Sequence, residues 1–479
     1  MSDEKKWYQS PLSERYASQE MSYLFSPQFK YSTWRSLWIA LARAQKTLGV
    51  PITEAQIRAM QAFRENIDFA KAEVYEAKVR HDVMAHILTF GEQCPEIKGV
   101  LHLGATSCFV TDNTDLIQMR EALKLVRNKI IQVIRQLADF AKEHAHRPCL
   151  SYTHFQVAQP TTVGKRACLW LQDFLIDLHD LNYCLDTLRF LGTKGATGTQ
   201  SSFLLLFNND HDKVKKLETL IADEMGFSQT YLISGQTYTR KQDIRILHIL
   251  SSLAATSHKM ATDLRLLSHL KEVEEPFAEK QVGSSAMPYK RNPMRSERVC
   301  GLARFLISLH ENPLYTAATQ WMERTLDDSA NRRMVLPEAF LTADGILSLL
   351  INVTAHIIVH PQVIRRNLEE ELPFLATEHL LMESVKRGKD RQHIHEILRK
   401  HSLDAAHRVK EEGKPSDLLE HLANEPDLGL SRDEVFEIAQ AEHFIGRAAE
   451  QVEEFLLQEV NPVLQQNKDI PHCAVSIVI

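Results

Sequence analysis

The stretch MREALKLVRNKIIQVIRQLADF, residues 119–140, decides the fold class. Its apolar residues follow an unbroken 4-3-4-3-4-3 spacing, which runs through Met119, Leu123, Val126, Ile130, Val133, Leu137 and Phe140. Residues at these intervals share one face of an α-helix and form a seam like that of a coiled coil. Because residues 105–147 contain neither glycine nor proline, the pattern predicts one long helix.

Two further segments, residues 165–191 and 236–275, also lack glycine and proline and carry similar spacings. Their seams comprise Ala167, Leu171, Phe174, Leu178, Leu181, Leu185 and Leu188 in the first, and Ile244, Leu247, Leu250, Ala254, Ala261, Leu264 and Leu267 in the second. A helix of 40 residues is roughly 60 Å long and is stable only when it packs along its length. A set of separate short helices fits these regular spacings less well, so the sequence predicts an elongated helical bundle.

The chain is therefore expected to be all-α, with three mostly helical domains. The first covers residues 1–106, the central long-helix bundle covers 107–359, and a smaller C-terminal domain covers 360–479. The composition agrees, because 17 glycines and 17 prolines make up about 7% of the 479 residues, against roughly 12% in average usage.

Charge and cysteine content exclude several classes of protein. The net charge of −6 and the pI near 6.4 argue against a general nucleic-acid binder. Seven widely spaced cysteines without a CxxC pair favour neither a disulfide framework nor a cysteine-based zinc site. The N-terminus has no apolar signal-peptide core, and we found no run of apolar residues long enough to span a membrane. We expect a cytoplasmic protein without a membrane partner.

Residues 283–293, GSSAMPYKRNP, lie between two long helical segments and have a composition that no helix explains. The segment combines two hydroxyls, Ser284 and Ser285, with Lys290, Asn292 and backbone N–H groups. Hydroxyls can exchange a proton, and cations and N–H donors can hold carboxylates. These groups suit a reaction that passes through a carbanion beside a carboxylate.

Three other polar clusters occur along the chain. They are Arg80-His81-Asp82, the string TSCFVTDNTD from Thr106 to Asp115, and Thr153-His154-Phe155-Gln156. With 22 histidines present, a single histidine is more often an ordinary surface or core residue than a catalyst. By residue chemistry alone, His154 suits proton transfer at neutral pH, because an unperturbed histidine has a pKa of about 6.5.

The segment 283–293 resembles the signature loop G-S-S-x-M-P-x-K-x-N-P of the fumarase/aspartase superfamily, whose members eliminate fumarate from succinyl-type substrates. The longer string SSAMPYKRNPMRSE is most similar to the adenylosuccinate lyase branch. The three polar clusters match that branch in order, as do Arg15-Tyr16, residues 234–238 and the run from Arg324 to Arg333. The resemblance spans residues 15 to about 333.

The resemblance implies a C–N lyase of purine biosynthesis that converts adenylosuccinate to AMP and fumarate and SAICAR to AICAR and fumarate. It assigns Ser284 as the general base and His154 as the general acid, although Ser285 stays open as the base. Lys290 and His81 are the other catalytic candidates. The substrate-binding candidates are Arg15, Tyr16, Arg80, Asp82, Thr106, Ser107, Thr153, Gln236, Asn292, Arg298, Arg324, Ser329 and Arg333.

The family is homotetrameric, with each site drawn from three chains, and the resemblance implies no cofactor and no metal. His393 and His395 are two residues apart, which puts their rings on different sides of a helix. The glycine-rich run 192–199 resembles a phosphate loop weakly and is expected to be a bend. The alternatives are a sibling lyase that cleaves argininosuccinate or a simple dicarboxylic acid, and a helical scaffold without catalysis.

Overall fold

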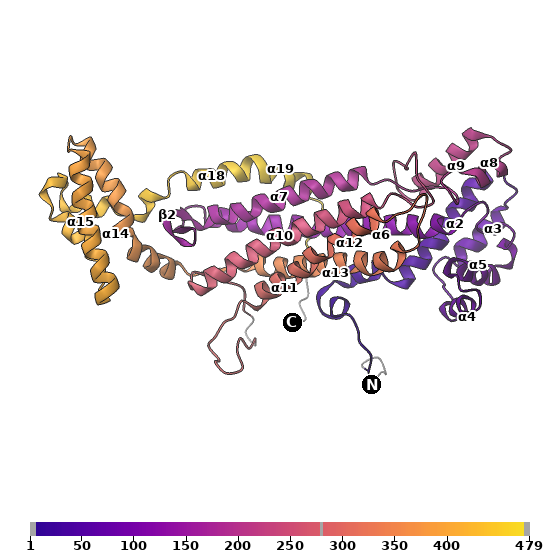
Figure 1. Cartoon of the computed structure of the whole chain (residues 1–479), viewed down its shortest axis with the longest axis horizontal. Helices are drawn as coiled ribbons and strands as arrows, with labels where there is room; N and C mark the ends of the chain where they lie inside the picture. Colours follow the sequence, from indigo (N-terminus) through magenta and orange to yellow (C-terminus); the bar gives the residue numbers. More distant parts are fainter. Residues whose placement is uncertain (1–5, 278–280, 474–479) are drawn as a thin grey trace.

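The computed structural model describes residues 6–277 and 281–473 and is an elongated, mostly helical molecule (Figure 1). Its central part is a bundle of long helices that run side by side along the long axis. These are α6 (Ser107–Glu143), α7 (Val163–Thr187), α10 (Lys241–His269), α11 (Met294–Leu309) and α13 (Asp328–Ala355). The expected all-α fold class is thus confirmed.

The heptad positions form the core of this bundle, as the spacing predicted. In α6, Met119, Leu123, Val126, Ile130, Val133 and Leu137 are at most 1% exposed. The corresponding residues of α7 and α10 are buried as well, except that Leu185 and Ile244 are only partly covered. Burial of a leucine-sized side chain contributes roughly 1.5–3 kcal/mol, so the three seams hold the bundle together.

Helix α13 is the one helix in the described part of the chain that is both long and apolar enough to cross a membrane. Its length and hydropathy match those of a membrane span, but 83% of its most apolar window is buried inside the bundle. It packs against α6, α10 and α11. An apolar helix that is covered on all sides is a core helix, and α13 has that role here.

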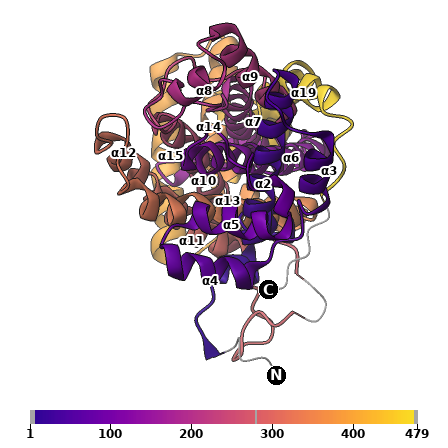
Figure 2. The ribbon, with the colours of Figure 1, turned by 90° about the vertical axis from the view of Figure 1, so that its right-hand side faces the viewer.

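One end of the bundle is covered by the N-terminal helices. They are α2 (Pro27–Thr47), α3 (Glu54–Ala62), α4 (Phe69–Val79), α5 (Asp82–Gln93) and η3 (Pro95–Ile97). The two preceding helices, η2 (Leu12–Tyr16) and α1 (Gln19–Leu24), pack along the bundle on α13 and α6. Helix α2 extends into the bundle and contacts α6, while α8 (Ser201–Leu206) and α9 (His211–Glu224) lie at the same end. Figure 2 looks onto this end and shows α4 and α5 in front of the bundle helices.

The other end carries a hairpin and the C-terminal helices (Figure 1). Strands β1 (Pro148–Thr153) and β2 (Gln156–Thr162) pair antiparallel, and β3 (Val273–Glu274) pairs with β4 (Ile358–Val359). Beyond them lie α14 (Pro361–Lys386), α15 (Arg391–Glu412), α16 (Leu418–Ala423), η4 (Pro426–Leu428), α17 (Arg432–Ile438) and η5 (Ala441–Phe444).

The chain then returns along the bundle through α18 (Ala448–Phe455), η6 (Leu456–Val460) and α19 (Asn461–Gln466), with α18 packed on α7. The remaining short helix, α12 (Glu311–Ala318), lies between α11 and α13 in the chain. Helix α6 begins at Ser107 and α14 begins at Pro361. The division of the chain into three domains at residues 106 and 359 stays a prediction.

Candidate active site

The N-terminus of α6 brings the first two polar clusters together. Thr106 is the N-cap of α6 and Ser107 is its first residue. His81 is the N-cap of α5, where its Nδ1 accepts a hydrogen bond from the Met84 N–H at 3.4 Å. The His81 Nε2 lies 3.4 Å from the Ser107 Oγ. The α6 N-terminus has no side-chain cap, so its first N–H groups favour an anionic ligand, whereas Asp82 and His81 cap the N–H groups of Val83 and Met84 in α5.

Gln236 and Arg324 join this cluster through Cys108. The Cys108 thiol donates to the Gln236 Oε1 at 3.4 Å, and the Arg324 Nη1 lies 2.7 Å from the Cys108 Sγ. The Gln236 Nε2 donates to the Ala196 carbonyl, which fixes the orientation of its amide. Burial raises the pKa of Cys108 to about 12, so the thiol stays neutral and acts as a donor.

Arg333 lies at the edge of the same region, near the start of α13. Burial lowers the pKa of Lys30, and the nearby charge of Arg333 lowers it further, whereas Asp115 and Asp82 oppose the shift. Lys30 and Arg333 thus lie close enough to interact, and the carboxylates Asp115, Asp82 and Glu76 lie near Lys30 as well. Ser329, one helical turn before Arg333, is half-buried.

A buried network of ion pairs lies beneath this cluster and joins α6, α10 and α13. Arg240 pairs with Asp112 at 2.9 Å and with Asp328 at 2.7 Å. Arg332 pairs with Asp115 at 2.9 Å and with Asp243 at 2.7 Å. The side chains of Arg240, Asp112 and Asp328 are at most 3% exposed. Because each buried charge has a partner, the network fixes the elements that hold the cluster.

His154 lies far from this cluster, at the tip of the hairpin between β1 and β2. Thr153 pairs with Gln156, so His154 and Phe155 form a two-residue turn, and both have positive φ values of 53° and 59°. Two successive positive φ values are typical of a type I′ turn, which matches the twist of a hairpin. The turn presents the His154 side chain to solvent.

The signature loop stands apart from the bundle between α10 and α11 in both views (Figures 1 and 2). The Ser284 Oγ accepts hydrogen bonds from the N–H groups of Ala286 at 3.3 Å and Met287 at 3.1 Å. Donors aimed at a hydroxyl oxygen stabilise its anion, so they favour Ser284 as a base. Within the described ranges, Ser285 accepts no such hydrogen bonds, and it is exposed.

The base of the loop is narrow, and its shape depends on Gly283 and Asn292. The Asn292 Nδ2 donates to the Gly283 carbonyl at 2.8 Å. A Cβ atom added to Gly283 would lie 2.0 Å from the Lys290 carbonyl oxygen, so no other residue fits there without a rearrangement. The Lys290 side chain is exposed, and the half-buried Arg298 follows within α11.

Glu275 holds the far end of the loop and was not singled out from the sequence. Its carboxylate accepts the N–H groups of Arg295 and Ser296, both at 2.9 Å, at the start of α11. It is only 5% exposed. The sequence signal was a carboxylate pair directly before Pro276, but pairs of this kind are common on solvated surfaces.

Arg15 and Tyr16 lie apart from the other predicted substrate-binding residues. They end η2, which packs on α13, and Tyr16 contacts Gly345. Gly345 is 12 residues beyond Arg333, which corresponds to about 18 Å along the helix. Arg80, by contrast, lies next to His81 as the left-handed C-cap of α4 with a φ of 52°.

The structure therefore divides the predicted residues into separate groups within one chain. His81, Asp82, Thr106, Ser107, Gln236, Arg324 and Arg333 gather around the start of α6. The hairpin with His154 is at the opposite end of the bundle, and the loop with Ser284 projects from its side (Figure 1). Sequence reasoning missed Lys30 and Cys108, because one buried lysine or cysteine has no distinctive pattern.

The glycine-rich run 192–199 is a structural bend. The Asn113 Oδ1 accepts the N–H groups of Leu191 and Gly192 at 3.0 and 3.1 Å, and the Lys194 ammonium pairs with Glu218 at 2.7 Å. The Gly192 N–H and the Lys194 ammonium are therefore occupied by partners within the chain. In the parts of the chain that the structure describes, no group of three or more histidine, cysteine or carboxylate residues could hold a metal ion.

Comparison with known proteins places these features in one family. The family described as "Lyase" matches residues 8–306, and the family described as "Adenylosuccinate lyase C-terminus" matches residues 373–455. The adenylosuccinate lyase of Saccharomyces cerevisiae is 52% identical over 461 residues, with 96% of each chain covered. The adenylosuccinate lyase of Schistosoma mansoni is 49% identical over 469 residues, with 98% of each chain covered.

Solved structures agree on the fold. The 3-carboxy-cis,cis-muconate lactonizing enzyme from Pseudomonas putida superposes with a TM-score of 0.83 at 23% identity, covering 95% of this chain and 99% of that one. A fumarate lyase from Mesorhizobium sp. BNC1 gives 0.79 at 23% identity, covering 94% and 100%. With relatives that are about half identical over nearly the whole length, the chain belongs to the adenylosuccinate lyase family.

Proposed function

We propose that this chain eliminates fumarate from adenylosuccinate, giving AMP, and from SAICAR, giving AICAR, in purine nucleotide biosynthesis. A base removes the proton from the Cβ of the succinyl group, and the electron pair of that C–H bond is delocalised into the adjacent carboxylate. The C–N bond then breaks, its electrons go to the nitrogen, and an acid protonates that nitrogen. The products are fumarate and the amino compound.

Ser284 is the base in this proposal, and His154 is the acid. Support for Ser284 comes from the two N–H groups that point at its oxygen, because they stabilise the alkoxide over the alcohol. The exposed Lys290 ammonium in the same loop adds positive charge. His154 suits the role of acid, because an imidazole can carry a proton near neutral pH.

The cluster at the start of α6 binds the substrate in this proposal. Ser107, Gln236 and the α6 N-terminus supply hydrogen-bond donors for the succinyl carboxylates and for the extra charge that develops in the transition state. Arg324 and Arg333 suit a phosphate, because a guanidinium can donate two parallel hydrogen bonds to it. His81 lies against Ser107 and orients it.

The observation that carries the proposal is the separation of these groups within one chain. The hairpin, the loop and the α6 cluster lie at different places on an elongated molecule and do not meet (Figure 1). A working site therefore requires several copies of the chain, with the hairpin of one copy reaching the cluster of another. We propose a homotetramer in the cytoplasm whose sites are each assembled from three subunits.

An apolar stripe on α7 supports association of this kind. Leu169, Ile176 and Tyr183 follow each other at intervals of seven residues and are 52%, 55% and 62% exposed. They lie on the face of α7 opposite its buried seam. Large apolar side chains at heptad spacing on an exposed helix face are suited to packing against another helix.

Complementation between subunits tests the proposal. His154→Ala and Ser284→Ala, each purified alone, are expected to release almost no fumarate from adenylosuccinate or SAICAR. After the two variants are mixed and their subunits exchanged, sites that take an intact His154 from one copy and an intact Ser284 from another regain activity. If exchanged mixtures stay inactive while the wild type is active, each site is built within one subunit and the proposed assembly is wrong.

A further inference from the structure

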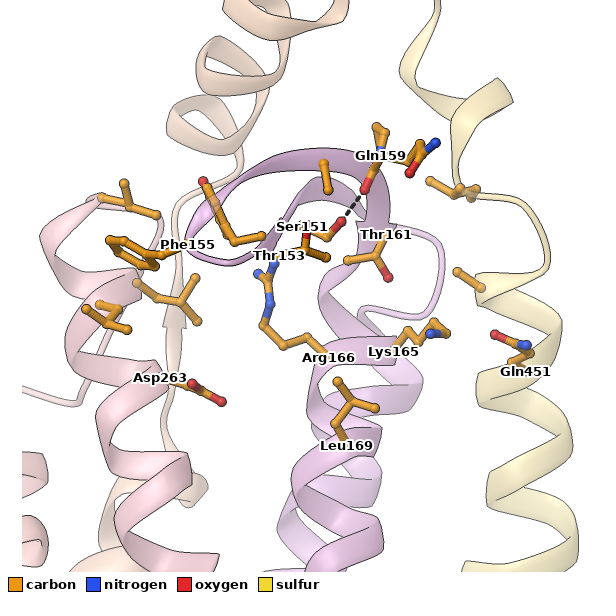
Figure 3. A pocket seen from close by; sticks show the side chains of 18 of the residues that line it. Ser151, Thr153, Phe155, Gln159, Thr161, Lys165, Arg166, Leu169, Asp263 and Gln451 are labelled. Carbon is orange, nitrogen blue, oxygen red and sulfur yellow. Dashed lines mark hydrogen bonds between the residues drawn. The ribbon is translucent and has the colours of Figure 1, made fainter. Parts of the chain in front are cut away.

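A cavity of about 550 Å³ lies directly behind the hairpin that carries His154 (Figure 3). Its walls come from β1 and β2, the first turns of α7, the last turns of α10 and the start of α18. Its size falls within the range of small-molecule sites, roughly 300–1,000 Å³. The residues that gather around the start of α6 take no part in it.

Among the charged residues that line this cavity, cations outnumber carboxylates. Lys165, Arg166 and Arg447 line it, and Asp263 is the one carboxylate among the lining residues. That carboxylate is already engaged, because its Oδ2 accepts the Trp170 Nε1–H at 2.7 Å and the Lys259 ammonium at 3.1 Å. The cavity therefore has an excess of positive charge.

Lys165 differs from the other two cations of the cavity in its hydrogen-bond partners. Arg447 pairs with Glu454 at 2.7 Å, and Arg166 donates to the Leu150 carbonyl. Among the residues that the structure describes, no carboxylate or carbonyl accepts from the half-buried Lys165 ammonium. Figure 3 shows Lys165 extending from α7 toward Gln451 of α18, whereas Asp263 of α10 lies on the other side of α7 in this view.

Hydroxyl donors and an apolar wall complete the site. Burial raises the pKa of Tyr152 to about 12, so its hydroxyl keeps its proton and can donate a hydrogen bond. Leu266, Leu267 and Leu270 of α10 form an apolar side. A ligand that satisfies both sides carries an oxyanion on one end and a flat or branched apolar body on the other.

We propose that this cavity binds a small organic oxyanion, a phosphate or carboxylate attached to an apolar body, at a place that the residues of the α6 cluster do not line. Thr153 and Phe155, the residues directly before and after His154, line the cavity. An occupant therefore sets the position of the hairpin that carries the acid. The link to turnover rests on the proposed role of His154, whereas the binding itself does not.

Calorimetric titration of the full-length chain with phenyl phosphate and with benzoate tests the site, with phenol as the uncharged probe. We expect at least one of the two anions to bind and phenol not to bind. Lys165→Gln is expected to weaken that binding at least ~10-fold, because a hydrogen bond to a charged group is lost. Lys165→Arg, which keeps the charge, is expected to restore it.

Lys142→Gln is the matched control, because Lys142 is an exposed lysine of α6 outside the cavity. Equal binding to the wild type and Lys165→Gln would overturn the proposal, since the anion would then occupy another site such as the arginines of the α6 cluster. Absence of binding by both anions would overturn it as well. Fumarate release is measured in parallel. An inactive wild type would count against the proposed function, but it would not change what the titrations say about anion binding.

Discussion

The α6 cluster and the signature loop both carry candidate site residues, yet they are built in opposite ways. The cluster rests on Arg240 and Arg332, whose carboxylate partners come from α6, α10 and α13 and are largely buried. The loop from 284 to 291 is mostly exposed, and hydrogen bonds within the loop hold Ser284. The folded chain holds the first region in place, whereas the second is exposed to solvent in the single chain.

The difference shows how an enzyme of this kind can combine rigidity with access. Substrate-binding groups act best when they are held in place before the ligand arrives, because reorganisation costs binding energy. A loop that must close over the substrate cannot be buried in the empty enzyme. Variants in the two regions should therefore separate effects on activity from effects on stability.

The largest effect is expected from Ser284→Ala. Removal of the proposed base should lower kcat for fumarate release roughly 10²–10⁴-fold, while the unfolding midpoint in urea stays unchanged because the side chain is on an exposed loop. Ser285→Ala is the matched control and should keep most of the activity. The reverse result, with activity lost only in Ser285→Ala, would move the base by one position.

Arg240→Met should destabilise the α6 cluster. Asp112 and Asp328 would remain buried without their partner, and loss of one member of a buried pair costs about 3–5 kcal/mol of the free energy of unfolding. Arg291→Gln removes an exposed ion pair with Glu274, 3.2 Å long, and should cost less than about 1 kcal/mol. Urea unfolding of both variants measures the contrast, and equal costs would refute it.

Gly283→Ala tests whether the shape of the loop matters as much as its serine. The added methyl group conflicts with the Lys290 carbonyl, so Ser284 should move and kcat should fall about 10²-fold, as expected for a misplacement of about 1 Å. Gly301→Ala, in α11 with open space around its Cβ position, is the control. Unchanged kinetics in Gly283→Ala would show that the loop adapts.

The smallest effect is expected in the dependence of the unfolding free energy on pH. Burial lowers the pKa of His86 to about 4, and this side chain is 4% exposed and stacks on Tyr31 at 3.7 Å. The unfolded chain binds this proton near pH 6.5, so the stabilisation is complete above that pH and is lost as the pH falls toward 4. At pH 5 the cost is about 2 kcal/mol.

His86→Phe should therefore lower the slope of the unfolding free energy against pH between 6.5 and 4, and part of the slope should remain because burial also lowers the pKa of His102 to about 4. His179→Phe, at a side chain that is 84% exposed, should leave the dependence unchanged. If the unfolding free energy had the same slope against pH in the wild type and in His86→Phe, protonation of His86 would not contribute to acid destabilisation.

Much of the fold could be predicted because helix periodicity is a local property. The seams of α6, α7 and α10 were read directly from apolar spacing, and nearly all their residues are buried. The hairpin around His154 was not predicted. Its two-residue turn is His154-Phe155 rather than the Asn-Gly or Asp-Gly pair that signals such turns.

The candidate site could be predicted as a set of residues but not as an arrangement. Motif order identified His81, Ser107, Gln236 and Arg324, and the structure joins them through hydrogen bonds that involve Cys108. No spacing in the sequence could place Tyr16 beside Gly345, about 18 Å along α13 from Arg333. Contacts between distant segments depend on how the helices pack.

The sequence by itself determined the helical class, the core faces of the long helices and the identity of the chemical groups. These follow from the 3.6-residue period and from side-chain chemistry, both of which are local. Only the tertiary structure decided that His154, Ser284 and the α6 cluster lie apart in one chain, and that an anion-suited cavity lies behind the hairpin. Distances between segments are set by the packing of whole helices, which no local pattern specifies.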